Sequence, residues 1–195
     1  MNKTLLVTIL FLVLGSGAKS QARPGIKAGL NNSNISSTTL DNKNSIYIGA
    51  FIDIRFTDYY TLQPEVLYSG QGGRSNSIVY GNVNINYISI GVPNKFYVGP
   101  NRGFHFIIGP SIDINVENTP VSLTNGSNDF EISPLDISFF GGIGYEFGFG
   151  LILEARYKQG TFSTDFFGET DLYEEDGSQL NTVLQVGLAY KFKIR

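Results

Sequence analysis

Apolar and polar residues alternate strictly through most of the chain, in segments of about ten residues. In residues 46–56, IYIGAFIDIRF, every second side chain from Ile46 to Phe56 is apolar, whereas the opposite face carries Asp53 and Arg55. The same split recurs in residues 104–115 and 182–192. Successive side chains of a β-strand point to opposite faces of its sheet, so the alternation predicts strands with one wholly apolar face.

Eight segments follow this pattern and are the predicted strands: residues 24–32, 46–56, 60–70, 83–97, 104–115, 135–147, 151–160 and 182–194. The connections between them alternate in length. Those at 57–59, 98–103 and 148–150 are short, whereas those at 33–45, 71–82, 116–134 and 161–181 are long and rich in Asn, Ser, Thr, Gly and Asp. A meander with short turns at one rim and long loops at the other is typical of outer-membrane barrels.

The fold class predicted by this pattern is all-β, an eight-stranded antiparallel up-and-down transmembrane β-barrel. In hydrocarbon every backbone N–H and C=O group must be paired, and a sheet pairs them all only when it closes. We therefore expect a monomer in the outer membrane, with both termini on the periplasmic side. An interfacial girdle is expected from aromatic residues near the short turns, although these also suit an ordinary core: Phe56, Tyr60, Phe96, Phe104, Phe147 and Phe192.

The first residues, MNKTLLVTILFLVLGSGAKSQA, have the form of a secretory signal peptide. A basic start is followed by the apolar stretch Leu5 to Leu14 and then by small residues. A membrane anchor is the alternative, but the apolar stretch is half of the roughly 20 residues that a spanning helix needs. We predict a signal peptide at residues 1–20, with cleavage after Ser20 or as late as Ala22, and a barrel domain at residues 24–195.

The polar faces of the predicted strands carry equal numbers of opposite charges. In an eight-stranded barrel the interior is only wide enough for side chains, so charges that face inward must neutralise one another. The balance predicts a plugged lumen rather than a pore. The predicted lumen charge network consists of Lys27, Arg55, Lys95, Arg156, Lys158 and Lys191 with Asp53, Glu65, Asp113, Asp136, Glu146 and Glu154.

Glycines gather in residues 138–150, SFFGGIGYEFGFG, where a phosphate-binding loop is the first idea to test. The spacing G-x-G-x-x-G fails twice, because Phe147 and Leu153 stand where the third glycine belongs. We expect these glycines to leave room for long side chains such as Arg156 and to form a tight turn. Prolines are a second irregularity: Pro64 and Pro110 each remove a ladder donor, which predicts a bulge or a strand start at both.

Composition excludes several kinds of chemistry. The chain has no cysteine, so it forms neither disulfides nor thiolate sites. Loss of Lys3 and Lys19 with the signal peptide leaves 12 of the 14 Lys and Arg against 17 Asp and Glu, a net charge of −5 that argues against a nucleic-acid partner. The acidic stretch ETDLYEEDGSQ at residues 169–179 lacks the spacing of an EF-hand, and carboxylates in a long loop are usually solvated. No metal site or cofactor is predicted.

His105, the single histidine, is the first candidate for acid–base chemistry. Ser111 and Asp113 share its predicted face, but at about 3.4 Å per residue they lie roughly 20 Å or more from it along the strand. That separation is too large for a catalytic triad within one strand. We therefore expect no catalytic residue and no enzymatic activity.

Six segments of the chain carry a family resemblance: GIKAGLNNS (25–33), LQPEVLYSGQGG (62–73), NYISIGVPNKF (86–96), FIIGPSIDI (106–114), GGIGYEFGFGLILEARYKQG (141–160) and LQVGLAYKF (184–192). Through these segments the chain resembles the Bacteroidetes outer-membrane β-barrel family called PorT-like. The resemblance implies an eight-stranded outer-membrane barrel, mostly of unassigned activity, with one namesake linked to protein secretion. Members commonly read YLEIPLLLKY where this chain has YISIGVPNKF, so Ser89 replaces a carboxylate and the proline moves from position 91 to Pro93.

The function predicted from these observations is a binding or structural role through the extracellular loops, with an accessory role in protein secretion as one option. The expected partners are outer-membrane lipid and lipopolysaccharide, the barrel-assembly machinery during biogenesis, and a secretion-machine component. Two alternatives stay open. One is an outer-membrane enzyme that modifies lipids, and the other is a secreted soluble barrel that binds a ligand, which would place its apolar face inside.

Overall fold

The computed structural model describes residues 21–35, 41–74, 83–116, 135–162 and 181–193. Their strands form one antiparallel sheet: β1 (Gln21–Ile35), β2 (Asp41–Arg55), β3 (Tyr60–Leu62), β4 (Glu65–Arg74), β5 (Val83–Gly91), β6 (Asn94–Tyr97), β7 (Phe104–Asn115), β8 (Leu135–Glu146), β9 (Leu151–Phe162) and β10 (Asn181–Lys191). The described residues include no helix that is long and apolar enough to cross a bilayer. The predicted signal peptide and the acidic stretch at residues 169–179 lie outside the described residues.

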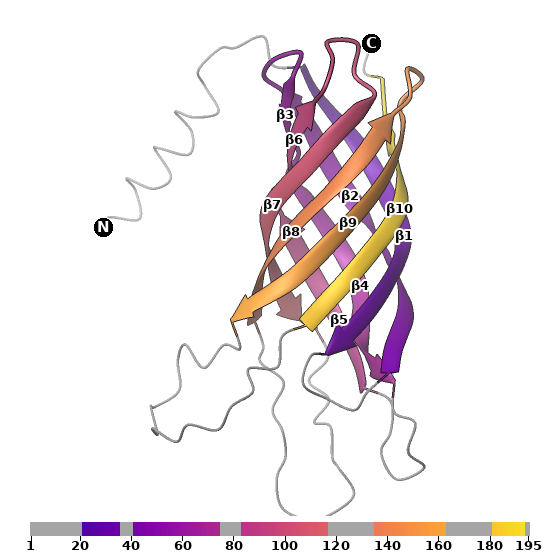
Figure 1. Ribbon diagram of the computed structural model, residues 1–195, viewed down its shortest axis with the longest axis vertical. Helices are drawn as coiled ribbons and strands as arrows, with labels where there is room; N and C mark the ends of the chain where they lie inside the picture. The colour runs from indigo at the N-terminus through magenta and orange to yellow at the C-terminus, as the bar shows by residue number, and fades with distance from the viewer. Residues whose placement is uncertain (1–20, 36–40, 75–82, 117–134, 163–180, 194–195) are drawn as a thin grey trace, which may run out of the picture.

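The sheet closes on itself because β1 pairs with both β10 and β2. Strands β3 and β4 continue one another around Gln63 and Pro64, as do β5 and β6 around Val92 and Pro93. The ten strands therefore make up the eight continuous strands of one closed antiparallel barrel (Figure 1). We call each continuous strand a stave; the staves are β1, β2, β3 with β4, β5 with β6, β7, β8, β9 and β10. The predicted fold class is confirmed.

Strand boundaries match the alternation closely where the apolar face is continuous; β7, for example, spans residues 104–115 as predicted. The largest differences are at β1 and β2, which are 15 residues each and extend into the predicted loop at 33–45. Asparagines replace apolar residues there, so the sequence shows no hydrophobic period, yet the ladder continues through the pair Ser33 and Lys43.

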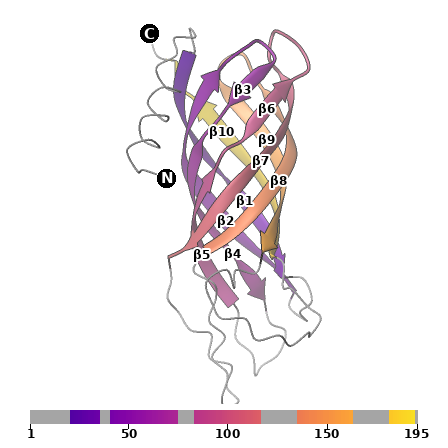
Figure 2. The ribbon, with the colours of Figure 1, turned by 90° about the vertical axis from the view of Figure 1, so that its left-hand side faces the viewer.

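All three short turns lie at one end of the barrel, and the strand ends that lead to the long connections lie at the other (Figures 1 and 2). Strand β1 begins and β10 ends beside the short turns, where Gly25 pairs with Lys191 and the Phe192 N–H donates to the Pro24 carbonyl at 2.9 Å. We call these the short-turn end and the long-loop end.

Apolar side chains cover the outside of the barrel and charged ones fill the inside. Ile46 and Ile48 are 65% and 57% exposed, whereas Lys95 and Asp53 are completely buried. A water-soluble barrel has the reverse distribution, so the soluble alternative does not fit. From Ile46 of β2 to Phe56, the residue just after its end, the apolar face spans roughly 34 Å along the strand, or about 25 Å along the barrel axis at a typical tilt, which is the height of the lipid-facing band of such barrels.

Aromatic rings gather on the outer wall at the short-turn end, as an interfacial girdle requires. Phe56, Tyr60 and Phe96 form a row with centroid separations of 5.8 and 5.4 Å. Phe56 and Phe96 are about half exposed, so they are not core residues. The side chains of this group face lipid rather than the lumen.

The prediction at Pro64 is correct, because this residue separates β3 from β4. The prediction at Pro110 is wrong: β7 continues through it in unbroken register with β8. The neighbouring stave is interrupted instead, at Val92 and Pro93, where the Val92 N–H donates to the Pro110 carbonyl at 3.0 Å. Pro110 has no N–H to donate to the Val92 carbonyl, so the second hydrogen bond of this pair is missing. The strand that contains Val92 and Pro93 is therefore interrupted, whereas β7 stays continuous.

Glycines on the inner face make room for large side chains. A Cβ at Gly25 would lie 2.1 Å from the Phe51 ring, and one at Gly142 would lie 2.3 Å from the Ala155 carbonyl and 3.0 Å from Cγ of Arg156. The second position agrees with the role expected from the sequence. Gly150 has a φ of +102° in the turn between β8 and β9, a conformation that favours glycine.

Candidate functional site

The charged lumen is the candidate site, and the structure brings most of the predicted network into it. Ten of the twelve residues are buried, each no more than 8% exposed: Lys27, Asp53, Glu65, Lys95, Asp113, Glu146, Glu154, Arg156, Lys158 and Lys191. Arg55 is placed elsewhere, because β2 ends at this residue and its guanidinium pairs with Asp58 in the adjoining turn. Asp136 is half-buried and lies opposite Asp113 in the β7–β8 register.

Five charges from four staves meet at the centre of the lumen. Lys27 Nζ contacts Glu65 at 2.7 Å and Glu154 at 2.8 Å, and Lys95 Nζ contacts Glu154 at 2.5 Å. Arg156 bridges both carboxylates, at 2.5 Å to Glu65 and 2.8 Å to Glu154. We call these five residues the central cluster. Its pairs join β1, β4, β6 and β9, so they tie opposite walls of the barrel together.

A second group, the short-turn cluster, closes the lumen where β2, β8 and β10 approach the short turns. Lys191 Nζ contacts Glu146 at 2.5 Å, and Tyr97 donates its hydroxyl to the same carboxylate at 2.8 Å. The side chain of Arg102 folds back from the turn at 98–103 into this group, with Nη1 at 3.0 Å from Glu146 and 3.3 Å from Asp53. Its guanidinium also lies over the Tyr97 ring, 5.0 Å from the centroid.

Arg102 is the functional residue that sequence reasoning missed. Its φ of +61° is unusual for a residue other than glycine, and it holds the side chain against the barrel end. Burial by itself lowers the pKa of its guanidinium, but Tyr97, Glu146 and Asp53 raise it by more, so the net direction is upward and the charge is retained. The sequence feature that could have identified Arg102 is an arginine beside Gly103 in a short turn, next to strands rich in inward carboxylates.

A third group occupies the lumen towards the long-loop end. Lys158 Nζ contacts Asp113 at 2.5 Å and donates to the Ser89 hydroxyl at 3.1 Å. Ser138 donates to Asp113 at 3.1 Å and lies 2.8 Å from the Ser111 hydroxyl. These residues form the long-loop cluster. Three charged clusters are thus distributed along the lumen from end to end.

His105 is buried between the first two clusters, with no exposed surface. Its Nδ1 lies 2.9 Å from the Gly103 carbonyl and its ring packs on Tyr97 at 4.8 Å. Ser111 and Asp113, the residues considered as triad partners, belong to the long-loop cluster instead. Within the described residues, no group of three or more His, Cys, Asp or Glu is placed to hold a metal ion.

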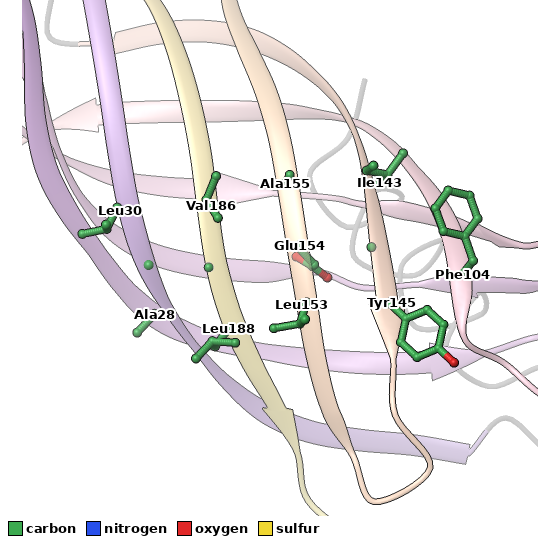
Figure 3. A pocket seen from close by; sticks show the side chains of 13 residues that line it. Ala28, Leu30, Phe104, Ile143, Tyr145, Leu153, Glu154, Ala155, Val186 and Leu188 are labelled. Carbon is green, nitrogen blue, oxygen red and sulfur yellow. The ribbon is translucent and has the colours of Figure 1, made fainter.

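An open apolar groove of about 670 Å³ lies on the outer wall over β1, β10, β9 and β8, with Phe104 of β7 at its edge (Figure 3). The small side chains of Ala28 and Ala155 leave a depression between the larger side chains of Leu30, Leu153 and Val186. Its surroundings are the lipid-facing apolar side chains described above. In a bilayer such a groove is filled by acyl chains, so the lumen remains the candidate site.

Comparisons with known proteins agree with this geometry. A family described as outer membrane protein beta-barrel domain matches residues 17–165. The crystal structure of Ail, the attachment invasion locus protein of Yersinia pestis, is similar with a TM-score of 0.54 at 10% identity, covering 88% of this chain and 97% of that one. Ail in a phospholipid nanodisc gives 0.53 at 12% identity, covering 88% and 100%.

Neisserial surface protein A is also similar, with a TM-score of 0.48 at 15% identity, covering 88% of this chain and 97% of that one. None of the curated proteins compared with the sequence matches it. At identities this low the structural likeness concerns the fold alone.

Proposed function

This chain belongs to the outer membrane protein β-barrel domain family, and from that premise we propose that it is a monomeric barrel with a filled lumen that acts by binding through its long connections. The outer membrane is its location. The proposal assigns no transport role to the lumen. It treats the barrel as a rigid membrane-embedded support for the connections at the long-loop end.

The observation that carries the proposal is the ion-paired lumen. The central and short-turn clusters join strands from different sides of the barrel, the long-loop cluster joins β5, β7, β8 and β9, and an eight-stranded barrel leaves no width beyond its own side chains. Leaving any of these charges unpaired is costly, since breaking a buried pair typically costs about 3 to 5 kcal/mol. An ion that passed through would have to disrupt several such pairs in succession.

Conductance in a planar bilayer tests this. The purified barrel is expected to insert without producing discrete current steps, while a general porin in the same membrane serves as the positive control. Folding is verified by the mobility difference between unheated and boiled protein on a denaturing gel, and insertion by recovery of the barrel with liposomes of the same lipid on flotation. Regular current steps from inserted wild-type protein would contradict the filled-lumen proposal.

The proposal places the long-loop end outside the cell and both termini in the periplasm. Support comes from the alternation of short and long connections, which outer-membrane barrels orient in this way. The absence of native cysteine makes single-cysteine labelling clean. In intact cells a membrane-impermeant maleimide is expected to label Val116→Cys at the long-loop end but not Asn101→Cys in a short turn. Labelling of Asn101→Cys alone would show that the orientation is the reverse of the proposed one.

An accessory role in protein secretion is proposed as the finer form of this function, on the basis of the resemblance to the PorT-like family. Mild crosslinking of outer membranes followed by affinity capture of the barrel tests it. A reproducible secretion component in stoichiometric amount supports the role. Recovery of the barrel together with only the assembly machinery and lipid argues for a stand-alone role.

The proposal includes no enzymatic activity. Complete burial of His105 and its contacts with Gly103 and Tyr97 support a packing role for the imidazole. Replacing it in His105→Gln is expected to leave the lipid A and phospholipid profiles of the outer membrane unchanged, as measured by mass spectrometry. A change in either profile, with the barrel still folded, would favour the lipid-modifying alternative.

A further inference from the structure

Four outward-facing asparagines form a hydrogen-bonded patch where β1 and β2 approach the long-loop end. Asn32 pairs with Asn44 across the two strands, and its Nδ2 donates to the Asn44 Oδ1 at 2.7 Å. Asn42 donates to Asn32 at 3.0 Å, and Asn34 donates to Asn42 at 2.5 Å. We call this group the asparagine ladder. Asn42 and Asn44 are exposed, and Asn32 and Asn34 are half-buried.

The ladder begins where the apolar band ends. Outward-facing pairs of β1 and β2 run in the order Ala28 with Ile48, Leu30 with Ile46, and then Asn32 with Asn44. Four residues past Leu30, Asn34 stands roughly 14 Å further along the strand, or about 10 Å along the barrel axis at a typical tilt. Since the headgroup layer of a bilayer is several Å thick on each side of the hydrocarbon, the ladder lies in and just above this layer.

The neighbouring stave extends the same surface. Gly70 of β4 has no side chain, and a Cβ there would lie 3.4 Å from Oδ1 of Asn86 on β5. Below it on the outer face of β4, Tyr68 is 44% exposed. Tyr68 pairs with Ile88, and the next outward pair along the two strands is Gly70 with Asn86, so the ring lies diagonally across from the Asn86 amide. An aromatic ring next to an amide suits a sugar ring, because C–H groups pack on the aromatic face while hydroxyls bond to the amide.

The chemistry of the patch favours neutral polar ligands over anions. Each primary amide has two N–H donors and a carbonyl that accepts two bonds, so the bonds within the ladder leave capacity for outside groups. No member of the patch carries a charge, and Lys43, between Asn42 and Asn44 in the same strand, donates inward to the Gln71 carbonyl at 2.9 Å. Phosphate recognition usually depends on Arg or Lys.

We propose that the asparagine ladder, with Tyr68 and Asn86, is a binding surface for the sugar portion of glycolipids in the outer leaflet. The proposal depends on the orientation given under the proposed function, because only the outward-facing leaflet presents such sugars. The occupant is the membrane's own glycolipid, held against one side of the barrel by its saccharide. Its acyl chains then lie along the apolar band of β1, β2 and β4.

Native mass spectrometry of the detergent-solubilised barrel tests this with three probes: lipopolysaccharide with a full core oligosaccharide, lipid A alone, and a phosphatidylethanolamine. The wild type is expected to retain the full-core glycolipid at least about fivefold better than lipid A, and the double variant Asn42→Thr/Asn44→Thr is expected to lose this preference. Threonine suits a strand and keeps the surface polar. The control Asn101→Thr, in a short turn, should behave as the wild type.

Equal retention of full-core lipopolysaccharide and lipid A by the wild type overturns the proposal, as does a preference that survives in the folded double variant. Lipid-free core oligosaccharide is the fourth arm: displacement of the bound glycolipid supports recognition of the sugar itself, and failure to displace it at millimolar concentration counts against it. The orientation is read separately by labelling Val116→Cys in intact cells, because this residue follows β7 at the long-loop end, is 47% exposed and lies outside the ladder. Correct labelling of this variant together with no sugar preference in the wild type refutes the ladder proposal alone.

Discussion

Arg102 is a turn residue whose side chain completes the network inside the barrel. It supplies one of the two cations that face Glu146 and Asp53, the other being Lys191. A positive φ of 61° is tolerated at this arginine because its side chain gains these contacts. The geometry makes Arg102 a closing residue of the short-turn end rather than a solvent-facing turn arginine.

Replacing Arg102 by methionine is expected to destabilise the barrel by roughly 2 to 3 kcal/mol, slightly less than for a fully buried partner, because the side chain is 12% exposed. Urea titration of the folded fraction in detergent micelles measures the change. Arg55→Met is the matched control: its ion pair with Asp58 is solvent-exposed, so a change within about 0.5 kcal/mol is expected. Equal effects at both arginines would contradict the assignment of Arg102 to the lumen.

Arg156 tests the central cluster. Its guanidinium binds Glu65 through both terminal nitrogens, at 2.5 and 3.3 Å. Arg156→Met removes the guanidinium bonds of both carboxylates and leaves Glu65 with Lys27 as its cation partner, and we expect a loss of about 3 to 5 kcal/mol in unfolding free energy. Arg156→Lys keeps the positive charge but cannot bind Glu65 through two nitrogens, so a smaller loss of unfolding free energy is expected. Urea midpoints of the two variants decide this, and equal losses would show that the charge alone matters.

At the residue scale, alternation predicted which strand residues face inward but not what the turns contribute. Lys27, Glu65 and Arg156 were identified because a period of two assigns each position to a face. Arg102 lies outside any strand, so the alternation makes no prediction about the direction of its side chain. Arg55 was misassigned for the same reason, since it is the last residue of β2 and its side chain is free to turn towards Asp58.

At the scale of elements, three consecutive staves are weakened at neighbouring positions. Single backbone bonds remain where proline cannot donate: the Ile52 N–H to the Pro64 carbonyl at 3.0 Å, the Gln63 N–H to Pro93 at 2.8 Å, and the Val92 N–H to Pro110 at 3.0 Å. On the lipid side, Asn94 Nδ2 donates to the Val92 carbonyl at 3.1 Å, replacing the donor that Pro110 lacks. The hydroxyl of Tyr60 donates to Asn94 Oδ1 at 2.7 Å.

This proline seam is expected to be the part of the barrel wall that opens most readily. Amides of Ile52, Gln63 and Val92 should exchange with solvent deuterium roughly fivefold faster than those of the β9–β10 ladder, since one lost hydrogen bond is worth about 1 kcal/mol. Pro110→Val restores a donor and should slow the exchange at Val92, whereas Asn94→Leu should accelerate it. Uniform exchange across the wall, or no response to either substitution, would rule out a weak seam.

The elements themselves were largely readable from the sequence, because a lipid-facing wall imposes an uninterrupted apolar period on each stave. Two features were not. The extension of β1 and β2 carries asparagines outside the hydrocarbon, where the period has no reason to persist. The break at Val92 and Pro93 depends on Pro110 of the neighbouring strand, which has no N–H to donate to Val92, and pairing register is not written in a single strand.

At the scale of the whole molecule, three clusters close the lumen in series. The short-turn cluster, the central cluster and the long-loop cluster each bridge different staves, so removing one leaves the other two in place. Closure is therefore a property of the whole barrel rather than of any single residue. The charges balance only when the whole barrel is summed with its turn: Arg102 takes the place predicted for Arg55, which gives six cations against six carboxylates.

Series closure predicts a specific pattern of conductance. Arg102→Gly opens one mouth of the lumen but is expected to remain non-conducting in a planar bilayer, because the central cluster still fills the barrel. A quadruple variant also removes large side chains from the central and long-loop clusters: Arg102→Gly, Arg156→Ala, Glu65→Ala and Lys158→Ala. This variant is expected to produce small current steps if the barrel folds. The gel-mobility shift reports folding, and Arg55→Ala added to Arg102→Gly is the control for a second removed arginine. Conductance from Arg102→Gly alone would place the entire barrier at the short-turn end and contradict closure in series.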